Sequence, residues 1–244
     1  MKKILMCLFL AFGYGVANDE TTSDKNGILI GAEFGMSEMN EKRNTTVNTG
    51  TNIVTTVNTE DRYRYSAQLY GFKVGYKHFF TDLIGLQGYL SFKDAIVSTK
   101  NKGKDETSIT AGDVTVNGKG TRANSEVYHF MPLMANADVI FDFYKINNLS
   151  LDAIIGVGLG VAIVNYKYSN SSSSDLTVPT GSSTRRSYAG FYSDIKVGFG
   201  VNYDNSRIGV AAAFPMNSVN TTIDDVKYKT KLNYVVSLTY DYTF

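Results

Sequence analysis

The end of the chain carries the feature that most constrains the fold, an apolar or aromatic residue at every second position. Over residues 232–244 these residues are Leu232, Tyr234, Val236, Leu238, Tyr240, Tyr242 and Phe244, and those between them are mostly polar. Because strand side chains alternate between two faces, this pattern predicts a strand with one oily face and one mostly polar face. A lipid-facing barrel strand needs such alternation over about 9–11 residues. A strand of a soluble sandwich usually ends before the last residue, so the pattern favours a membrane barrel.

Seven further segments upstream repeat the alternation. They lie within residues 28–37, 70–77, 86–93, 133–141, 155–161, 191–201 and 208–214. The connections alternate in length, with short ones at 79–84, 142–148 and 204–206 and long ones at 38–62, 94–126, 167–187 and 217–231. Short turns at one end and long loops at the other are typical of outer-membrane barrels. With both termini at the short-turn end, the number of strands must be even.

We therefore expect an all-β fold, a transmembrane antiparallel up-and-down β-barrel of eight strands, with ten strands as the alternative. Its long loops are expected to be extracellular and its short turns periplasmic. Within the second long loop, Asn117-Gly118 is a typical hairpin turn signal, which predicts a hairpin over residues 114–120 above the membrane.

The start of the 244-residue chain indicates export. Lys2 and Lys3 precede a short apolar run over residues 4–12, and small residues end at Ala17. This order is typical of a secretory signal peptide, because the run is too short to span a bilayer as a helix. We predict a signal peptide over residues 1–17 and an outer-membrane β-barrel over residues 18–244, integral to the cell outer membrane.

Cleavage there changes the charge and the cysteine content of the mature chain. The formal charge falls from +1 to −1 when Lys2 and Lys3 leave, so no basic excess points to nucleic acid. The only cysteine, Cys7, leaves as well, which excludes disulfides and thiolate metal sites.

The inward face of the predicted strands carries charges of both signs. The acidic residues are Glu33, Asp138, Asp152, Asp194 and Asp241, and the basic residues are Lys73, Lys77, Lys93, Lys196 and Arg207. An eight-stranded barrel is only wide enough for its side chains to fill it, and unpaired buried charges are costly. This set therefore predicts an interior polar network that plugs the barrel. Many inward glycines leave the alternative of a narrow, charge-lined pore, although they also make room for Tyr89, Tyr192 and long basic side chains.

The sequence gives little support for catalysis. The two histidines are His78, beside a predicted periplasmic turn, and His129, near the exterior with outward parity. A histidine acts as a general base only with a nucleophile within hydrogen-bond reach. Gly156-Val157-Gly158-Leu159-Gly160 lacks the spacing of a nucleotide loop and no helix follows it. We expect no catalytic residues, no metal site and no cofactor.

Seven tyrosines near the predicted strand ends favour an aromatic girdle at the membrane interfaces. They are Tyr63, Tyr65, Tyr128, Tyr166, Tyr188, Tyr203 and Tyr242.

The chain resembles the outer-membrane protein family of Helicobacter and related ε-proteobacteria. The resemblance rests on the segments that begin at Gly71-Phe72-Lys73-Val74-Gly75 and at Gly85-Leu86-Gln87-Gly88-Tyr89, and on the terminal strand that starts at Asn233-Tyr234. It covers the barrel and not the loops, and it carries over no site residues. It implies an outer-membrane barrel whose larger members bear surface adhesion domains and a few of whose members are porins. This chain lacks a large N-terminal exposed domain.

The terminal segment also resembles the signal that the barrel-assembly machinery reads. The matching residues are Leu238, Tyr240, Tyr242 and Phe244.

We expect a structural or surface-interaction role, adhesion-like and carried by the extracellular loops. The alternatives are a small passive pore and, less favoured, a rim enzyme that modifies lipid or lipopolysaccharide. The expected partners are outer-membrane lipid or lipopolysaccharide, the barrel-assembly machinery, and an extracellular ligand or host surface.

Overall fold

The computed structural model describes residues 26–49, 55–111, 114–146, 148–174, 177–223 and 226–244. The predicted signal peptide lies outside these ranges. The strands are β1 (Gly27–Thr49), β2 (Thr55–Phe79), β3 (Ile84–Ala111), β4 (Val114–Ile146), β5 (Leu149–Ser174), β6 (Thr177–Tyr203), β7 (Ser206–Pro215), β8 (Val219–Ile223) and β9 (Val226–Thr243). Among the residues described, no helix is long and apolar enough to cross a bilayer.

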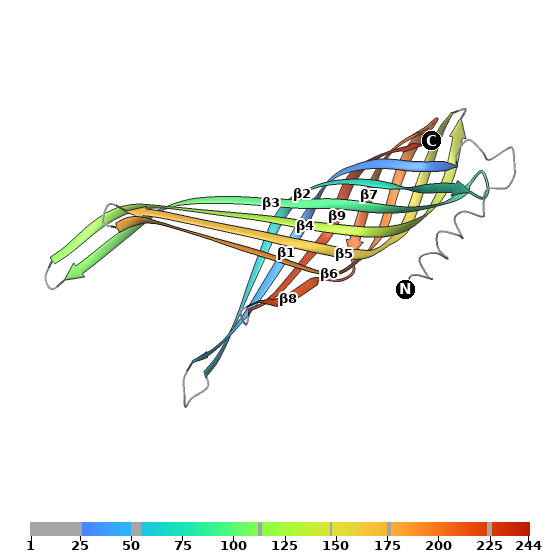
Figure 1. Cartoon of the computed structure of the whole chain (residues 1–244). Coiled ribbons are helices and arrows are strands. Elements are labelled where there is room, and N and C mark those ends of the chain that lie inside the picture. Colours follow the sequence, from blue (N-terminus) through green and yellow to red (C-terminus); the bar gives the residue numbers. More distant parts are fainter. Residues whose placement is uncertain (1–25, 50–54, 112–113, 147, 175–176, 224–225) are drawn as a thin grey trace.

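Eight of these strands close into a ring. Each of β1 to β7 pairs antiparallel with its neighbour in the sequence, and β9 pairs with both β7 and β1. The short β8 pairs with β9 beyond the ring. The predicted eight-stranded up-and-down barrel is therefore confirmed, and the terminal strand is the one that closes it (Figure 1).

The short turns, the start of β1 and the end of β9 lie together at one end of the barrel. There the Phe244 amide donates to the carbonyl oxygen of Ile28 at 3.0 Å. Only two residues join β6 to β7, and the first, Asp204, has φ of 49°. Aspartate tolerates this left-handed conformation because its short side chain forms local hydrogen bonds. The Asp204 carboxylate accepts a hydrogen bond from Asn148 of the neighbouring turn at 2.6 Å.

The ring presents an apolar outer wall, as the sequence alternation predicts. Large hydrophobic residues on every ring strand are exposed on this wall, among them Phe34, Phe72, Leu133, Phe199 and Leu238. Exposed apolar surface on this scale is unfavourable in water and is the lipid-facing band of a membrane barrel.

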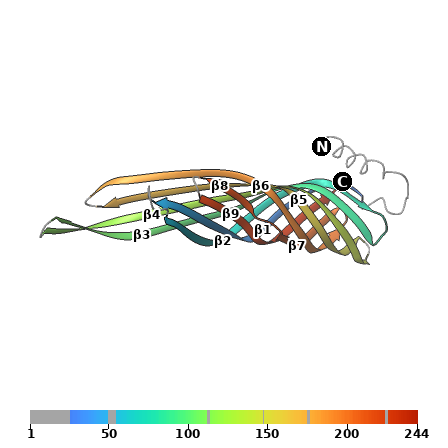
Figure 2. The same cartoon turned by 90° about the horizontal axis from the view of Figure 1, so that it is seen from below.

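At the other end the strands continue far past this wall, and the cylinder divides into two sheets. Pairing of β2 with β3 ends at Gln68 and Ile96, and pairing of β6 with β7 ends at Asp194 and Pro215. Beyond those points β3, β4, β5 and β6 form one sheet, which we call the long sheet, and β2, β1, β9 and β8 form the second sheet. The two sheets diverge in Figure 1, and Figure 2 shows that the long sheet reaches further from the barrel than the second sheet.

Two local sequence interpretations are wrong. Asn117 and Gly118 do not form the hairpin turn, since they pair with Ser108 and Thr107 inside the β3–β4 ladder and the strands meet at Ala111 and Val114. Continuous pairing to the tip overrides the local turn signal of Asn-Gly.

The second concerns Leu232, which does not belong to the outward series that ends at Phe244. A register shift opposite Ser37–Met39 in the β1–β9 ladder reverses the alternation, and Leu232 is fully buried. An extra residue in one strand moves every side chain beyond it to the other face.

Candidate functional site

The structure places every residue of the predicted polar network on the inner face of the barrel. All are buried, namely Glu33, Lys73, Lys77, Lys93, Asp138, Asp194, Lys196, Arg207 and Asp241. Asp152 joins them, also buried. Burial of so many charges requires that opposite charges compensate one another.

Three ion pairs share one construction, in which an acid and a base on alternate strands lie across a glycine of the strand between them. Lys93 Nζ lies 3.0 Å from Glu33 across Gly71. In the same way Lys73 Nζ lies 2.8 Å from Asp241 across Gly31, and Lys196 Nζ lies 3.1 Å from Asp138 across Gly156. The middle residue pairs with both charged residues in the ladders.

At Gly31 and Gly156 the glycine is required, because the paired side chains occupy the space that a Cβ would take. A Cβ at Gly156 would lie 2.7 Å from Asp138 Cγ, and one at Gly200 would lie 2.6 Å from Arg207 Cζ. Both distances are shorter than real Cβ contacts. The sequence left a pore open as an alternative because of the space beside inward glycines. At these positions charged side chains occupy that space.

Arg207 joins two carboxylates into one network. Its Nε and Nη2 donate to the two oxygens of Asp152, both at 2.7 Å, and its Nη1 lies 3.4 Å from Asp241, which also pairs with Lys73. Asn202 donates a further hydrogen bond to Asp152 at 2.7 Å. Bidentate guanidinium–carboxylate pairs are among the strongest polar contacts, so this corner is well compensated.

Asp138 is the acceptor for a second group of donors. Gln87 donates to it at 2.7 Å and the Tyr89 hydroxyl at 3.0 Å, while Lys196 also contacts Tyr89. Gln87 was missing from the predicted network, although its inward parity on the same strand as Tyr89 was a sufficient signal.

Lys77 and Asp194 are the two remaining members of the predicted network. Lys77 Nζ lies 5.8 Å from the ring centroid of Phe79. The Asp194 Oδ1 atom accepts no hydrogen bond from the residues that the structure describes.

An aromatic and aliphatic layer closes the barrel on the side of the extensions. Tyr128 and Phe130 are fully buried there, and the ring centroids of Tyr128 and Tyr166 lie 4.5 Å apart. Phe130 packs edge-to-face on Tyr192 at 5.3 Å. Met39, Leu69, Val164 and Leu232 complete the same core.

The girdle interpretation is thus wrong for four of the seven tyrosines. Tyr128 and Tyr166 are buried in this layer, and Tyr65 and Tyr188 pack against it. These tyrosines continue the inward alternation of the membrane segments of their own strands. The alternation, and not the position near a strand end, decides which way they face. Tyr203 and Tyr242 are exposed on the outer wall, as a girdle requires. Tyr63 is exposed on the β2 extension.

Polar contacts hold the two diverging sheets together just above this layer. The Tyr65 hydroxyl of the second sheet donates to Glu126 of the long sheet at 3.0 Å. Burial, together with the nearby carboxylate of Glu126, raises the pKa of the Tyr65 phenol, so it stays protonated as the donor. Tyr188 and Thr230 hydroxyls lie 2.6 Å apart across the opposite junction, and the Arg186 guanidinium lies over the Tyr228 ring at 4.7 Å.

Phe79, Ile140 and Ile154 form a small apolar cluster toward the short-turn end. Buried charges continue past this cluster, since along β5 Asp152 lies nearer the short turn than Ile154. The interior is therefore filled by charged side chains, with a small apolar cluster among them and the larger aromatic and aliphatic layer on the side of the extensions.

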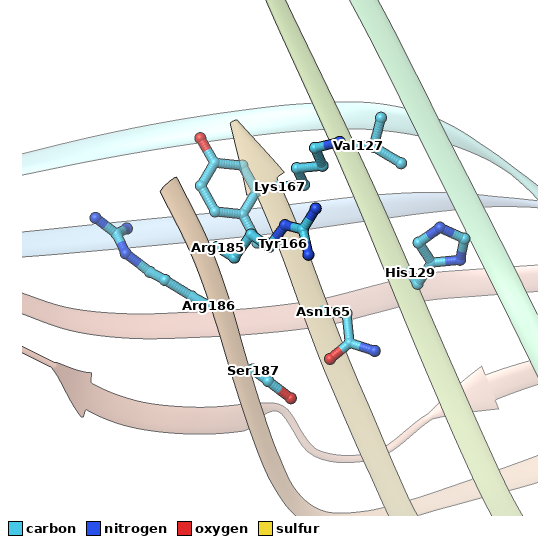
Figure 3. A pocket seen from close by; sticks show the side chains of 8 residues that line it. All are labelled: Val127, His129, Asn165, Tyr166, Lys167, Arg185, Arg186 and Ser187. Atoms are coloured by element: carbon cyan, nitrogen blue, oxygen red, sulfur yellow. The ribbon is translucent and has the colours of Figure 1, made fainter. Parts of the chain in front are cut away.

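His129 lies on the outer wall, as its parity predicts, and its ring nitrogen Nδ1 is 2.9 Å from Asp94. In Figure 3 Asn165 of β5 lies between His129 of β4 and Ser187 of β6, which carries a hydroxyl group. Within the described part of the chain, His129 has no hydrogen bond to a hydroxyl group, so the geometry supplies no activated nucleophile there. No group of three or more metal-ligating side chains occurs among the residues described.

Comparison with known proteins decides the family. Residues 71–244 match the family described as Helicobacter outer membrane protein. The chain belongs to this family. Its barrel is therefore integral to the bacterial outer membrane, with the short turns toward the periplasm and the two sheets toward the exterior.

Solved structures resemble the chain as barrels and only distantly. The attachment invasion locus protein Ail of Yersinia pestis is 15% identical, with 86% of this chain and 99% of that chain covered and a TM-score of 0.26. Neisserial surface protein A is 13% identical, with 89% and 97% covered and a TM-score of 0.36. The outer membrane protease OmpT of Escherichia coli is 9% identical, with 93% and 99% covered and a TM-score of 0.31. No curated protein matches the chain.

Proposed function

We propose that the chain is a sealed outer-membrane anchor that displays the long sheet and the second sheet for adhesion-like contact with a surface outside the cell. The observation that carries this proposal is the continuation of paired strands far beyond the lipid-facing wall. The β4–β5 ladder, for example, runs from Ile146–Leu149 at the periplasmic end to Gly120–Ser174. A barrel whose role ended in the membrane would need only short connections there, and exposed loops commonly carry the function of a rigid scaffold.

The filled interior supports a non-conducting barrel over a pore. Three pairs of the charges that would line a pore meet across glycines, and an aromatic and aliphatic layer covers them on the side of the extensions. Removing such charges from water is affordable only when they are paired, so a water-filled route through them would forfeit that pairing.

We also propose that the barrel-assembly machinery recognises the end of β9. Leu238, Tyr240, Tyr242 and Phe244 share one face and are exposed to lipid, and the rings of Tyr242 and Phe244 pack at 4.8 Å. Their accessibility before closure of the ring suits a recognition signal.

Trimming the extensions at known ladder pairs tests the adhesion-like role. One variant replaces residues 101–124 and 170–182 with Asn-Gly turns, which join Lys100 to Ser125 and Ser169 to Ser183, pairs of the same ladders. A matched variant replaces residues 44–60 in the second sheet, joining Arg43 to Asp61. Escherichia coli cells that display each chain are then compared for adhesion to cultured epithelial monolayers.

We expect the full chain to promote adhesion and at least one trimmed variant to lose it, while both keep the heat-modifiable gel migration of a folded barrel. Adhesion that is unchanged in both trimmed variants would contradict a role of the extensions.

A further inference from the structure

The outer wall of β4, β5 and β6 carries two cations just above the apolar belt. Two cross-strand rows meet there, Val127–Lys167–Arg185 and, one step nearer the membrane, His129–Asn165–Ser187. These residues line a groove of about 560 Å³ on the barrel wall (Figure 3).

Lys167 and Arg185 lie directly opposite each other in the β5–β6 ladder, and both are exposed. Like charges in this position destabilise a strand pair. Within the described part of the structure neither side chain forms an ion pair or a hydrogen bond, and the nearby carboxylate of Asp94 is engaged by His129. An anion between the two cations would remove this repulsion.

A different wall of the barrel shows that this lack of compensation is local. On β2, Arg64 also points outward above the belt, but its guanidinium lies 3.3 Å from Glu38 of β1. Lys167 and Arg185 thus lack the carboxylate partner that Arg64 has on the wall of β1 and β2.

The height of the pair on the wall indicates what kind of anion it suits. The last apolar row below it is Met131–Ile163–Ala189, and each two-residue step along a strand covers about 7 Å. Lys167 is two such steps above Ile163, and Asn165 and Ser187 supply an amide and a hydroxyl between them. An occupant that spans these rows has hydrocarbon below, hydrogen-bonding groups in the middle and a negative charge above.

We propose that this groove binds a phosphate group of the lipid A anchor of lipopolysaccharide in the outer leaflet. Arg185 would bind the phosphate oxygens through its planar fork, and Lys167 would act as a point charge on the same group. The acyl chains would lie on the belt below Ile163, and Asn165 and Ser187 would contact the sugar.

Native mass spectrometry of the refolded mature chain in detergent tests the assignment, with bisphosphorylated lipid A, dephosphorylated lipid A and inorganic phosphate as separate probes. The test variant is Lys167→Gln/Arg185→Gln. The matched control is Lys227→Gln/Lys229→Gln, which removes the same charge from two exposed positions of the second sheet. Heat-modifiable migration verifies that each variant folds, and Arg185→Gln alone serves if the double variant does not.

Bisphosphorylated lipid A should bind the wild type, with its dissociation constant at least about tenfold higher in the test variant, since two charge-assisted contacts are lost. The control should stay within about twofold, and dephosphorylated lipid A should bind about as weakly as the test variant binds the phosphorylated form. An unchanged test variant, or an equal loss in the control, would overturn the proposal. Displacement of lipid A by millimolar inorganic phosphate would also overturn it, because the groove would then be a free-phosphate site.

Discussion

The middle and the outer end of the barrel interior are filled in different ways. In the middle, charged side chains of neighbouring strands pair across glycines, so each residue depends on a particular partner. At the outer end, Tyr128, Phe130 and their neighbours fill space by packing on several residues at once. One barrel interior can thus be filled by two kinds of contact. Ion pairs lose their stabilisation when one partner is removed, whereas the packed layer loses it when side-chain volume is removed.

Replacing Arg207 with leucine should produce the largest effect in the charged layer. Asp152 loses its bidentate partner and Asp241 loses one of two cations, so the free energy of unfolding should fall by about 3–5 kcal/mol. Urea unfolding in detergent micelles measures this. Arg207→Lys keeps the charge and should cost less. Equal losses in the two variants would mean that volume, and not charge compensation, governs this corner.

Tyr128→Ala removes a fully buried ring from the aromatic layer. We expect a loss of about 3 kcal/mol in the free energy of unfolding, because a cavity replaces contacts with Tyr65 and Tyr166. Tyr128→Phe keeps the ring and should lose much less. The same urea titration applies, and a Tyr128→Ala variant as stable as the wild type would break the distinction between the two layers.

The Glu33–Lys93 pair offers a coupling test of the charged layer. Glu33→Gln and Lys93→Met should each destabilise by leaving one buried charge without its partner. The double variant should be more stable than the sum of the single losses predicts, by about 2 kcal/mol. A double-mutant cycle between Phe130 and Tyr192 should show a smaller coupling energy. Equal coupling energies in the two cycles would contradict the difference between the charged and the aromatic parts of the interior.

Gly156→Ala tests whether a glycine is needed between paired charges. The new methyl group would meet the Asp138 carboxylate, and we expect a loss of about 1–3 kcal/mol from overpacking. Gly71→Ala is the matched control and should lose less, since the nearest atoms there, Lys93 Cγ and the Phe92 carbonyl oxygen, both lie 3.1 Å from the new methyl group. Hydrogen exchange or urea titration compares the free energies of unfolding of the two variants. A larger loss for Gly71→Ala than for Gly156→Ala would contradict the role given to the glycines between paired charges.

Strand parity in the sequence was enough to predict the ring and the inward position of residues such as Lys73 and Lys196. It could not say that Lys196 pairs with Asp138 across Gly156, because the partners lie 58 residues apart in the chain and are joined by the register of two ladders. Nor could it place Leu232, since a single register shift reverses the face, or the division into two sheets above Gln68 and Ile96, which depends on where pairing stops.

Tyr128 shows a different limit. Its parity was readable, but its position near the expected end of a membrane segment suggested an interface, and the barrel interior extends further than the lipid-facing wall.

Single-channel recording of the refolded mature chain in planar lipid bilayers tests the sealed interior most directly. A conducting barrel added afterwards to the same membrane verifies that insertion events are detectable. The paired charges and the aromatic and aliphatic layer above them predict a flat current trace after insertion, at any applied voltage that the membrane tolerates. Reproducible openings of uniform size from the wild-type chain would contradict the account.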